Sequence, residues 1–355
     1  MSDNSAGVST LYDVYVDSTT TPTGPLATIV PKVVTVPAPT GSPAGFVSAP
    51  TGVVFNGISA DFDGKTFIFV TEDGTISAYP GVPAADENDA TLEVDNSKNP
   101  TAVDGAVYKG ATIAEFNGNY YLYVTNFRSG EIEIYDTNFA RVRMLDSGND
   151  PSDAWLGNRF ANPFEDDQIP RGFAPFNVQN IGGSLFVTYA KQDKSKHDNV
   201  AGDGLGYVDI YSPGGRLQAR LEHGPWLNAP WGAVWTPRDF GVFSNRVLIG
   251  NFGSGKIAVF NGFDGRFIGF VQQATATATS DSAVVIDGLW PWYSAIARPD
   301  ARPRRPRRHP RMKLRQEEPC PNAAPQARII PCFSAPGRTA RPMVCSARSP
   351  RSQPN

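Results

Sequence analysis

The chain alternates short hydrophobic runs with polar turns, and one strand–turn–strand unit recurs at intervals of about 55–65 residues. In each copy a hydrophobic run ends in a polar triplet, a turn that contains glycine follows, and a second β-run closes on an aromatic residue. The clearest copies span Val70–Tyr79, Val124–Tyr135 and Ile249–Phe260. Repetition at this period, with several short strands per unit, predicts the sheets of a β-propeller.

A turn motif also precedes the first strand of each unit. It reads Ala-Pro-x-Gly at Ala49–Gly52 and at Ala229–Gly232, and related motifs stand at Tyr108–Gly110, Pro175–Asn177 and Asp287–Trp290. Asparagine in place of glycine favours a positive φ at that position, because asparagine tolerates the left-handed region. The best-preserved unit then predicts four antiparallel strands, at Gly232–Trp235, Val247–Ile249, Ile257–Phe260 and Phe267–Val271.

The two ends of this region match only parts of the unit. Asp3 precedes Tyr12 by the same spacing with which Asn126 precedes Tyr135, so the chain is expected to start inside a unit. The last motif, Ile286–Trp290, has no second strand after it. We therefore expect residues 1–290 to form an all-β, six-bladed propeller of the NHL type, with four full blades, a truncated first blade and an incomplete last one.

Several strings resemble a bacterial family of conserved uncharacterised NHL-type propeller proteins. The strings that carry this resemblance are Ala49–Gly57, Thr71–Ser77, Gly172–Gly183, Tyr189–Asp193 and Asn228–Gly232. The resemblance implies the propeller fold but brings no catalytic residue, since the family has no assigned activity. It also implies an extracellular or periplasmic location, although Met1–Gly7 does not read as an export signal.

Composition divides the chain in two. The net charge of −3 combines a basic C-terminal region with an acidic remainder, because residues 292–355 hold thirteen Arg and one Lys against one Asp and two Glu. Twelve prolines in the same region oppose both helix and strand. We expect residues 291–355 to be a disordered Arg/Pro-rich tail, most simply an out-of-frame translation of GC-rich DNA, with Met1 an internal start. A genuine arm that binds nucleic acid or anionic lipid is the rival interpretation.

Other classes are disfavoured by composition. The chain is 40% hydrophobic, but it holds no apolar run long enough to span a membrane. Its three cysteines, Cys320, Cys332 and Cys345, all lie in the tail, which excludes a disulfide or a thiolate metal site in the body. No phosphate loop is present, since Gly202–Gly206 is not followed by a helix.

Four residues in corresponding positions of four units are candidate metal ligands. They are Glu72, Asn126, Asn251 and Asp3. Equivalent strand ends of a propeller converge on its central channel, where carboxylate and amide oxygens suit calcium. A calcium ion there could polarise a carbonyl, as in propeller lactonases. The alternative is that these side chains satisfy the amides of their own turns.

Further candidates line the channel or a long loop. Asn177 and Trp231 lie within two of the first-strand motifs, and His197 beside Asp198 lies in the 17-residue connection Ala190–Gly206. His197 could act as a general base, although a solvated charged loop explains it equally. Trp226, Trp231, Trp235 and Trp290 could stack on a sugar, but aromatic residues between blades are more often core. Asp61–Gly64 reads as a hairpin turn rather than a calcium loop.

A second long connection, roughly Ser147–Gly172, carries Trp155, Phe160 and Phe164 and could fold over one face as a lid. The sequence thus favours a monomeric scaffold that binds a small molecule or a protein. A calcium-dependent, lactonase-like hydrolase is the first alternative. A nucleic-acid binder that uses the basic tail is the second.

Overall fold

The computed structural model describes residues 2–11, 32–81, 89–101, 103–142, 163–272, 283–286 and 289.

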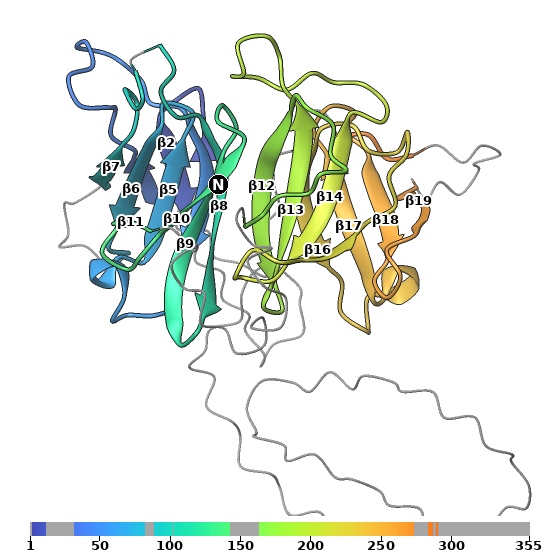
Figure 1. Cartoon of the computed structure of the whole chain (residues 1–355). Coiled ribbons are helices and arrows are strands. Elements are labelled where there is room, and N and C mark those ends of the chain that lie inside the picture. Colours follow the sequence, from blue (N-terminus) through green and yellow to red (C-terminus); the bar gives the residue numbers. More distant parts are fainter. Residues whose placement is uncertain are drawn as a thin grey trace, which may run out of the picture. The chain divides into compact units, whose positions relative to one another are not determined.

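 The chain divides into two units, Met1–Arg302 and Pro303–Asn355, and all of the described residues belong to the first. They form five antiparallel sheets, one of three strands and four of four strands (Figure 1). The predicted tail, residues 291–355, lies outside the described residues, as do Trp155 and Phe160 of the predicted lid.

The sheets follow one another along the sequence and are numbered 1 to 5. Sheet 1 contains β1 (Ser2–Asp3), β2 (Val8–Leu11) and β3 (Lys32–Thr35). Sheet 2 contains β4 (Pro50–Phe55), β5 (Phe67–Thr71), β6 (Thr75–Tyr79) and β7 (Thr91–Asp95). Sheet 3 contains β8 (Tyr108–Phe116), β9 (Asn119–Asn126), β10 (Glu131–Tyr135) and β11 (Arg141–Val142).

The last two sheets repeat this plan. Sheet 4 contains β12 (Phe173–Ile181), β13 (Ser184–Lys191), β14 (Gly206–Tyr211) and β15 (Leu217–Arg220). Sheet 5 contains β16 (Pro230–Trp235), β17 (Arg246–Asn251), β18 (Ile257–Asn261) and β19 (Phe267–Phe270). In every sheet each strand pairs with its neighbour in sequence, so the strands predicted for the best-preserved unit are confirmed.

Helical structure is limited to short turns in the described part of the chain. Two 3₁₀ turns occur there, η1 (Phe62–Gly64) and η3 (Gly241–Phe243). The first lies between β4 and β5, so Asp61–Gly64 forms a turn, as the sequence indicates, with Asp63 at φ 53°. Among the residues the structure describes, no helix has the length and apolar character needed to cross a membrane.

The first strand of each four-stranded sheet contains a β-bulge at the same place. The register shifts in sheets 2 to 5 fall between Pro50 and Gly52, Tyr108 and Gly110, Pro175 and Asn177, and Pro230 and Gly232. The residues inside these four bulges are Thr51, Lys109, Phe176 and Trp231. A bulge re-aims side chains and increases local twist. The repeated turn motif of the sequence therefore encodes a bulge.

The predicted positive φ after this bulge is wrong. Gly52, Gly110 and Asn177 are absent from the residues with positive φ in the described structure. Close approach between sheets explains the glycines instead. A β-carbon on Gly110 would stand 2.0 Å from Asn177 Oδ1, and one on Gly52 would stand 3.3 Å from the Gly110 Cα.

Neighbouring sheets pack through these first strands. β4 contacts β8, β8 contacts β12, and β12 contacts β16. Polar side chains link the strands across the gaps: Thr51 Oγ1 donates to Tyr108 O (2.8 Å), and Asn177 Nδ2 donates to Trp231 O (2.9 Å). A buried acceptor that is left without a donor costs about 1–3 kcal/mol, so these bonds fix the packing of one sheet on the next.

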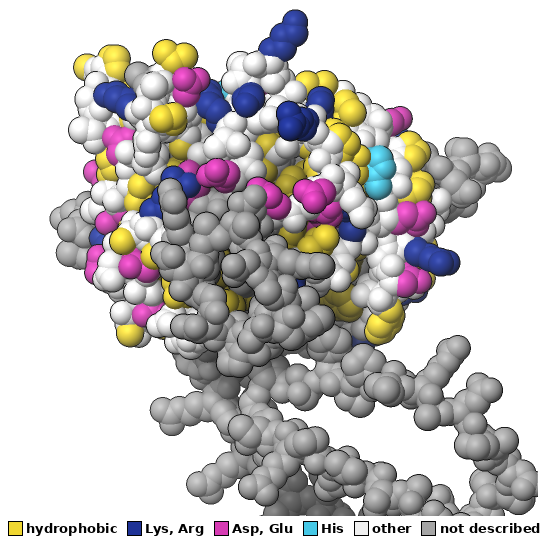
Figure 2. Space-filling view, in the orientation of Figure 1, with side chains coloured by type: hydrophobic (Ala, Val, Ile, Leu, Met, Phe, Trp, Pro, Cys, Tyr) yellow, Lys and Arg dark blue, Asp and Glu magenta, His cyan; other side chains and the backbone are white. Residues whose placement is uncertain are grey.

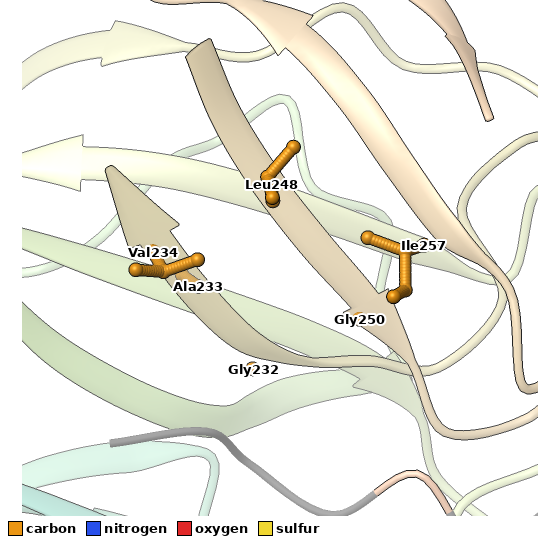
Figure 3. A pocket seen from close by; sticks show the side chains of 6 residues that line it. All are labelled: Gly232, Ala233, Val234, Leu248, Gly250 and Ile257. Atoms are coloured by element: carbon orange, nitrogen blue, oxygen red, sulfur yellow. The ribbon is translucent and has the colours of Figure 1, made fainter. Parts of the chain in front are cut away.

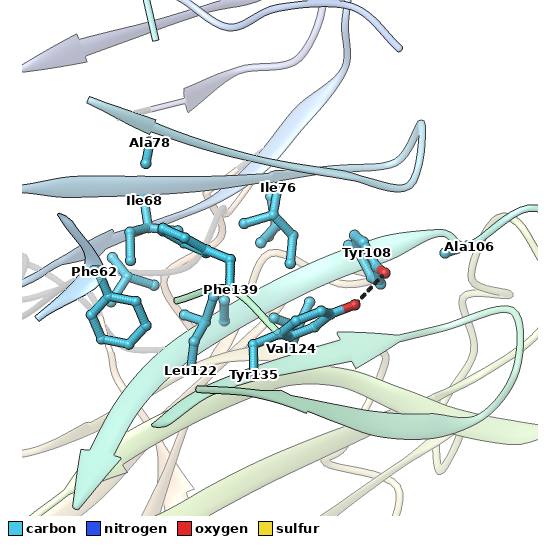
Figure 4. Close-up of a cluster of buried hydrophobic side chains, with 13 residues drawn as sticks. Phe62, Ile68, Ile76, Ala78, Ala106, Tyr108, Leu122, Val124, Tyr135 and Phe139 are labelled. Atoms are coloured by element: carbon cyan, nitrogen blue, oxygen red, sulfur yellow. Dashed lines mark hydrogen bonds between the residues drawn. The ribbon is translucent and has the colours of Figure 1, made fainter. Parts of the chain in front are cut away.

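Apolar side chains fill the spaces between sheets. Figure 4 shows the cluster between sheets 2 and 3, where Ile68 and Ile76 face Leu122 and Val124. Polar hydroxyls lie at its edge, since Tyr108 and Tyr135 share a 3.0 Å hydrogen bond. The next two interfaces contain similar clusters, which makes the body a series of sheets with one core layer between each pair.

Sheet 5 has a small apolar pocket on one face. The residues that line it are Gly232, Ala233, Val234, Leu248, Gly250 and Ile257 (Figure 3). Leu289, only 3% exposed, packs against this face at Gly250 and belongs to the same apolar cluster. The last first-strand motif of the sequence thus begins to cover sheet 5 in the way that each later sheet covers the one before it.

Candidate functional site

The start of each first strand and the end of each second strand lie at the same end of a sheet, because the strands are antiparallel neighbours. The bulges therefore lie at this end, together with the turns that follow β5, β9 and β17 and the long connection after β13. Chemically distinct side chains from several sheets meet there.

Lys109 of sheet 3 contacts side chains from two other sheets at this end. Its Nζ contacts Glu72 Oε1 of sheet 2 in a short ion pair and lies 3.5 Å from Asp198 Oδ1, in the connection between β13 and β14 of sheet 4. Asn4, which follows β1, donates from Nδ2 to Glu72 Oε2 at 3.0 Å. We call Asn4, Glu72, Lys109, His197 and Asp198 the Lys109 cluster. It draws side chains from sheets 1 to 4.

Exposure changes steeply across the cluster. The Lys109 side chain is 3% exposed and that of Glu72 is 17% exposed, whereas that of Asp198 is 68% exposed. Removing one partner of a buried ion pair costs about 3–5 kcal/mol, because the other charge is left uncompensated. An exposed pair contributes only about 0–1 kcal/mol. Glu72 therefore contributes more than the exposed Asp198 to fixing Lys109.

Asp73 adds a third carboxylate beside Glu72. Its Oδ2 accepts a 2.7 Å hydrogen bond from the Ala49 amide. Burial raises the pKa of Asp73, the Ala49 amide lowers it, the negative charge of Glu72 raises it, and His197 lowers it. The net effect is a raised pKa, and burial is its main cause.

His197 lies on the rim of the cluster. Its Nδ1 stands 3.2 Å from Asp198 Oδ1, and its side chain is 38% exposed. Asp193 fixes this segment, because its Oδ1 accepts from the backbone amides of His197 (3.0 Å) and Asp198 (3.4 Å). The sequence prediction that His197 and Asp198 form a pair is consistent with this geometry, and the role of a general base stays a prediction.

The connection from β13 to β14 is anchored to both neighbouring sheets. On the side of sheet 3, Gln192 Nε2 donates to Phe127 O and Asp198 pairs with Lys109. On the side of sheet 5, the Gly202 amide donates to Asn228 Oδ1 at 2.8 Å, and the Ala229 amide donates to Leu205 O at 3.2 Å. This loop therefore bridges sheets 3 and 5 across the end of sheet 4.

An aromatic layer adjoins the Lys109 cluster. It consists of Phe127, Phe176, Trp231 and Phe252, with ring centroids 4.9 Å apart for Phe176 and Trp231 and 5.2 Å apart for Trp231 and Phe252. Lys109 Nζ lies 5.8 Å from the centroid of Phe127, within cation–π range. One end of the sheets thus offers charged groups next to aromatic rings.

The predicted metal ligands divide into two sets. Asn126 Oδ1 accepts from the Val107 and Ser129 amides (both 3.3 Å), and Asn251 Oδ1 accepts from the Asn228 amide (2.8 Å). Both side chains thus satisfy turn amides. Glu72 instead pairs with Lys109, and the side chain of Asp3 lies outside the described residues.

The predicted ligands were expected to occupy equivalent positions, but Glu72 is displaced by one residue from the position of Asn126 and Asn251. Asn126 pairs with Tyr108 and Asn251 pairs with Pro230, but the residue paired with Pro50 is Thr71 rather than Glu72. A shift of one residue turns a side chain to the opposite face of a strand. Within the described ranges, no group of three or more His, Cys, Asp or Glu side chains is arranged to hold a metal ion.

Two of the remaining candidates, Asn177 and Trp231, lie between the sheets. Asn177 is 2% exposed, and its Oδ1 has no hydrogen-bond partner among the described residues. Trp231 is also 2% exposed and is core, whereas Trp235 is 36% exposed; Trp226 stacks on Phe267 with centroids 4.3 Å apart. Trp290 lies outside the described residues.

Phe164 of the predicted lid is a core residue, whereas most of the other described lid residues, 163–172, are exposed. Phe164 is 7% exposed, with its ring centroid 5.9 Å from that of Tyr123 and 5.5 Å from that of Tyr211. Lys109, by contrast, was missed by the sequence interpretation. Its signal was a lysine at a bulge position where the other sheets have Thr51, Phe176 and Trp231.

Similar proteins come from a virus. The chain is 32% identical over 214 residues to the uncharacterized protein R640 of Acanthamoeba polyphaga mimivirus, covering 60% of this chain and 36% of that protein. It is 30% identical over 185 residues to protein L690 (52% and 43%) and 29% identical over 250 residues to protein R648 (68% and 56%) of the same virus. The chain thus spans between about a third and just over half of these relatives.

These relatives overturn the resemblance to a bacterial family, which is wrong. No family model matches the chain. The likeness that the repeated strings carry is instead to uncharacterised viral proteins, and their printed names assign no activity. The bulged first strand requires these turn motifs, so they occur wherever such sheets occur. They therefore say little about the organism from which a chain comes.

Solved structures give only distant likenesses. A protein of unknown function from Bacteroides caccae matches with a TM-score of 0.34 and 11% identity, covering 64% of this chain and 62% of that one. Hydrazine synthase from Kuenenia stuttgartiensis matches with a TM-score of 0.36 and 14% identity, covering 66% and 53%. Both TM-scores lie below 0.5, too low to indicate a shared fold.

Proposed function

We propose that this protein is a β-propeller with six sheet positions that serves as a binding scaffold and engages its ligand or partner at the end where the bulges lie. The repeated bulge, the contacts between successive first strands and the position of Leu289 over sheet 5 support the propeller arrangement. Equivalent strand ends of such a fold converge around one axis.

One observation carries the binding assignment. At a single end, the Lys109 cluster gathers polar groups from four sheets, three of which contribute charged side chains, beside an aromatic layer from three. Binding sites commonly combine an apolar lining with a small number of placed polar groups. The exposed rim residues Asp198 and His197 lie on a loop that two sheets hold in place, and a rigid support of this kind favours recognition.

A fragment screen on the full chain tests this proposal. Amide exchange or NMR shifts should place the bound fragments at Lys109, Asp198 and Phe252. Fragments that gather instead at the opposite end of sheet 5, around the exposed Val242 and Phe263 (86% and 83%), would contradict it.

A calcium-dependent hydrolase is the second candidate on one observation, the position of the Glu72 and Asp198 carboxylates on either side of Lys109. Lys109 competes with a calcium ion for Glu72, because the Lys109 ammonium already neutralises this carboxylate. A rise in melting temperature with calcium that Glu72→Gln removes would support this candidate. The proposed nucleic-acid arm lies outside the described residues.

A further inference from the structure

Leu289, the last residue that the structure describes, packs on sheet 5 in the way that Tyr108 packs on sheet 2. Tyr108 stands just before the bulge of β8 and belongs to one apolar cluster with Ile76 of β6. Leu289 belongs to one cluster with Ile257 of β18, and a β-carbon on Gly250 would stand 3.1 Å from its Cδ2. Ile76 and Ile257 hold equivalent places in the registers of the two sheets. Leu289 is therefore a first-strand residue over sheet 5.

The backbone before Leu289 shows where in a first strand it lies. A β-carbon on Gly255 would collide with the carbonyl oxygen of Ile286, as one on Gly74 would collide with that of Ala106. Ala106 stands two residues before β8 begins, and Leu289 follows Ile286 by three. Because a strand advances about 3.3 Å per residue, Leu289 lies at the start of its strand, close to the position of the bulge.

Two residues at this point of β8 face opposite sides. Tyr108 faces the apolar cluster, whereas the ammonium of Lys109 contacts Glu72 and lies over the ring of Phe127. Leu289 lies in an apolar cluster, so it corresponds to Tyr108 rather than to Lys109. The residue that follows Leu289 is then the bulge residue.

The aromatic layer at the bulge end is an interior feature. Its Phe127, Phe176 and Trp231 are between 0% and 2% exposed. Hydrophobic side chains on the face shown in Figure 2 lie scattered among charged groups instead. Phe176 and Trp231 are the bulge residues of sheets 4 and 5, so an aromatic bulge residue is expected to be core.

The bulge residue of one sheet packs on the aromatic ring that follows the second strand of the sheet before it. Phe176 packs on Phe127 of sheet 3 in this way, with ring centroids 5.3 Å apart. Phe252 holds the same place in sheet 5, because its amide donates to Ala229 O (3.0 Å) as the Phe127 amide donates to Val107 O (2.8 Å). The next first strand is therefore expected to place its bulge residue on Phe252.

Trp290 follows Leu289 directly and lies outside the described residues. We propose that Trp290 is the bulge residue of the sixth sheet position and that its indole docks on Phe252, beside Trp231. The occupant of this face is the chain's own segment that starts at Trp290, because the described chain ends one residue before it, on sheet 5. This inference extends the proposed array of sheets and does not depend on ligand binding at the bulge end.

Fluorescence of the full chain tests this packing. Trp290→Phe removes one indole, so the difference spectrum against the unaltered protein belongs to Trp290. We expect emission at short wavelength and weak quenching by acrylamide, as for a buried ring. Trp235→Phe is the matched control, because Trp235 is 36% exposed and should be quenched more readily. A Trp290 indole that is quenched as readily in the folded protein as in urea overturns the inference.

Thermal unfolding gives a second readout. Trp290→Ala should lower Tm by about 5 °C or more, because a large buried ring is lost. Phe252→Leu should also lower Tm, and the double variant should lose less than the sum, because rings in contact are coupled. Phe252→Leu stays apolar, which favours folding, and Trp290→Phe takes the place of Trp290→Ala if the latter does not fold. Losses of Tm that simply add contradict the contact.

A second copy of the chain is the other possible occupant of this face. Tm would then fall on dilution and Trp290→Ala would leave it unchanged, a result that overturns the inference. The binding function is tested separately. Fragments that bind at Lys109 while Trp290 is exposed overturn this inference alone, and a protected Trp290 without bound fragments supports it while the binding function fails.

Discussion

The amide oxygen of Asn177 occupies the space that a β-carbon on Gly110 would need, at a separation of 2.0 Å. This relationship joins the first strands of sheets 3 and 4. Gly110→Ala should destabilise the protein by about 1–3 kcal/mol, because a buried methyl group forces the neighbouring strand to shift. Gly269→Ala is the matched control, since a β-carbon there meets nothing within 4 Å. Denaturant unfolding measures both.

The same pair gives a coupling test. Asn177→Gly restores the residue found at the equivalent positions Gly52 and Gly232, so it should recover part of the loss in Gly110→Ala. The two substitutions should couple by about 1 kcal/mol or more. If their effects simply add, the two strands do not meet in the way the structure shows.

Arg220 is expected to be a strong determinant of stability. Its Nε lies 2.7 Å from Asp209 Oδ1, it also pairs with Asp166, and Asp209 is fully buried. Arg220→Met should cost about 3–5 kcal/mol, because it leaves a buried carboxylate without its partner. Arg266→Met, which removes an 80% exposed side chain, should change the free energy of unfolding by less than about 0.5 kcal/mol.

The loss of stability caused by Arg220→Met should depend on pH. Burial raises the pKa of Asp209 and Arg220 lowers it, with a net rise from 3.8. A carboxyl whose folded-state pKa is raised holds its proton longer in the folded state, so stability falls as pH rises from 3.8 through the folded pKa. Removing Arg220 raises that pKa further. The deficit of Arg220→Met should therefore be smaller at pH 5 than at pH 8 in urea unfolding, and an equal deficit would contradict this account.

Tyrosine ionisation gives an independent check of the core. Burial is the main cause that raises the pKa of Tyr108, Tyr135, Tyr189 and Tyr211 above the ordinary 10, and nearby carboxylates add to the effect. The folded state therefore keeps protons that the unfolded state loses, and stability falls as pH rises above 10. Absorbance at 295 nm should show these phenolates only when the protein unfolds. Reversible titration of all tyrosines near pH 10 would exclude such burial.

Asp193 is expected to control the order of the bridging loop. The Ser195 hydroxyl, at 2.5 Å, and the backbone amides of His197 and Asp198 lower the pKa of Asp193 despite some desolvation. Because the pKa is lowered, the contribution to stability is present above pH 3.8 and is lost as pH falls through the folded pKa. Asp193→Ala should speed amide exchange in residues 193–200 and leave sheet 5 unchanged.

The sequence predicted the strands well, because each one carries a local pattern. The four predicted strands of sheet 5 and the turn at Asp61–Gly64 are present. The predictions that failed depend on how one strand pairs with the next. The register of the second strand against the first places Thr71 opposite Pro50, so Thr71 rather than Glu72 corresponds to Asn126 and Asn251.

The candidate site was only partly accessible to sequence reasoning. Asp198 and His197 were found from their neighbourhood in a long loop, but the partner of Asp198 is Lys109, 89 positions earlier in the chain. Contacts of this separation leave no local pattern. The lysine is recognisable only once the four bulges are aligned, since its position then holds Thr51, Phe176 or Trp231 in the other sheets.

The central claim is that Lys109 joins neighbouring sheets into one charged end, and a double-mutant cycle of Lys109→Met with Glu72→Gln tests it most directly. We predict that each single change destabilises the protein and that the two couple by more than about 1 kcal/mol, because either one alone leaves a largely buried charge unpaired. Effects that add to within about 0.5 kcal/mol would show that the two side chains do not meet, and would remove the basis of the proposed binding site.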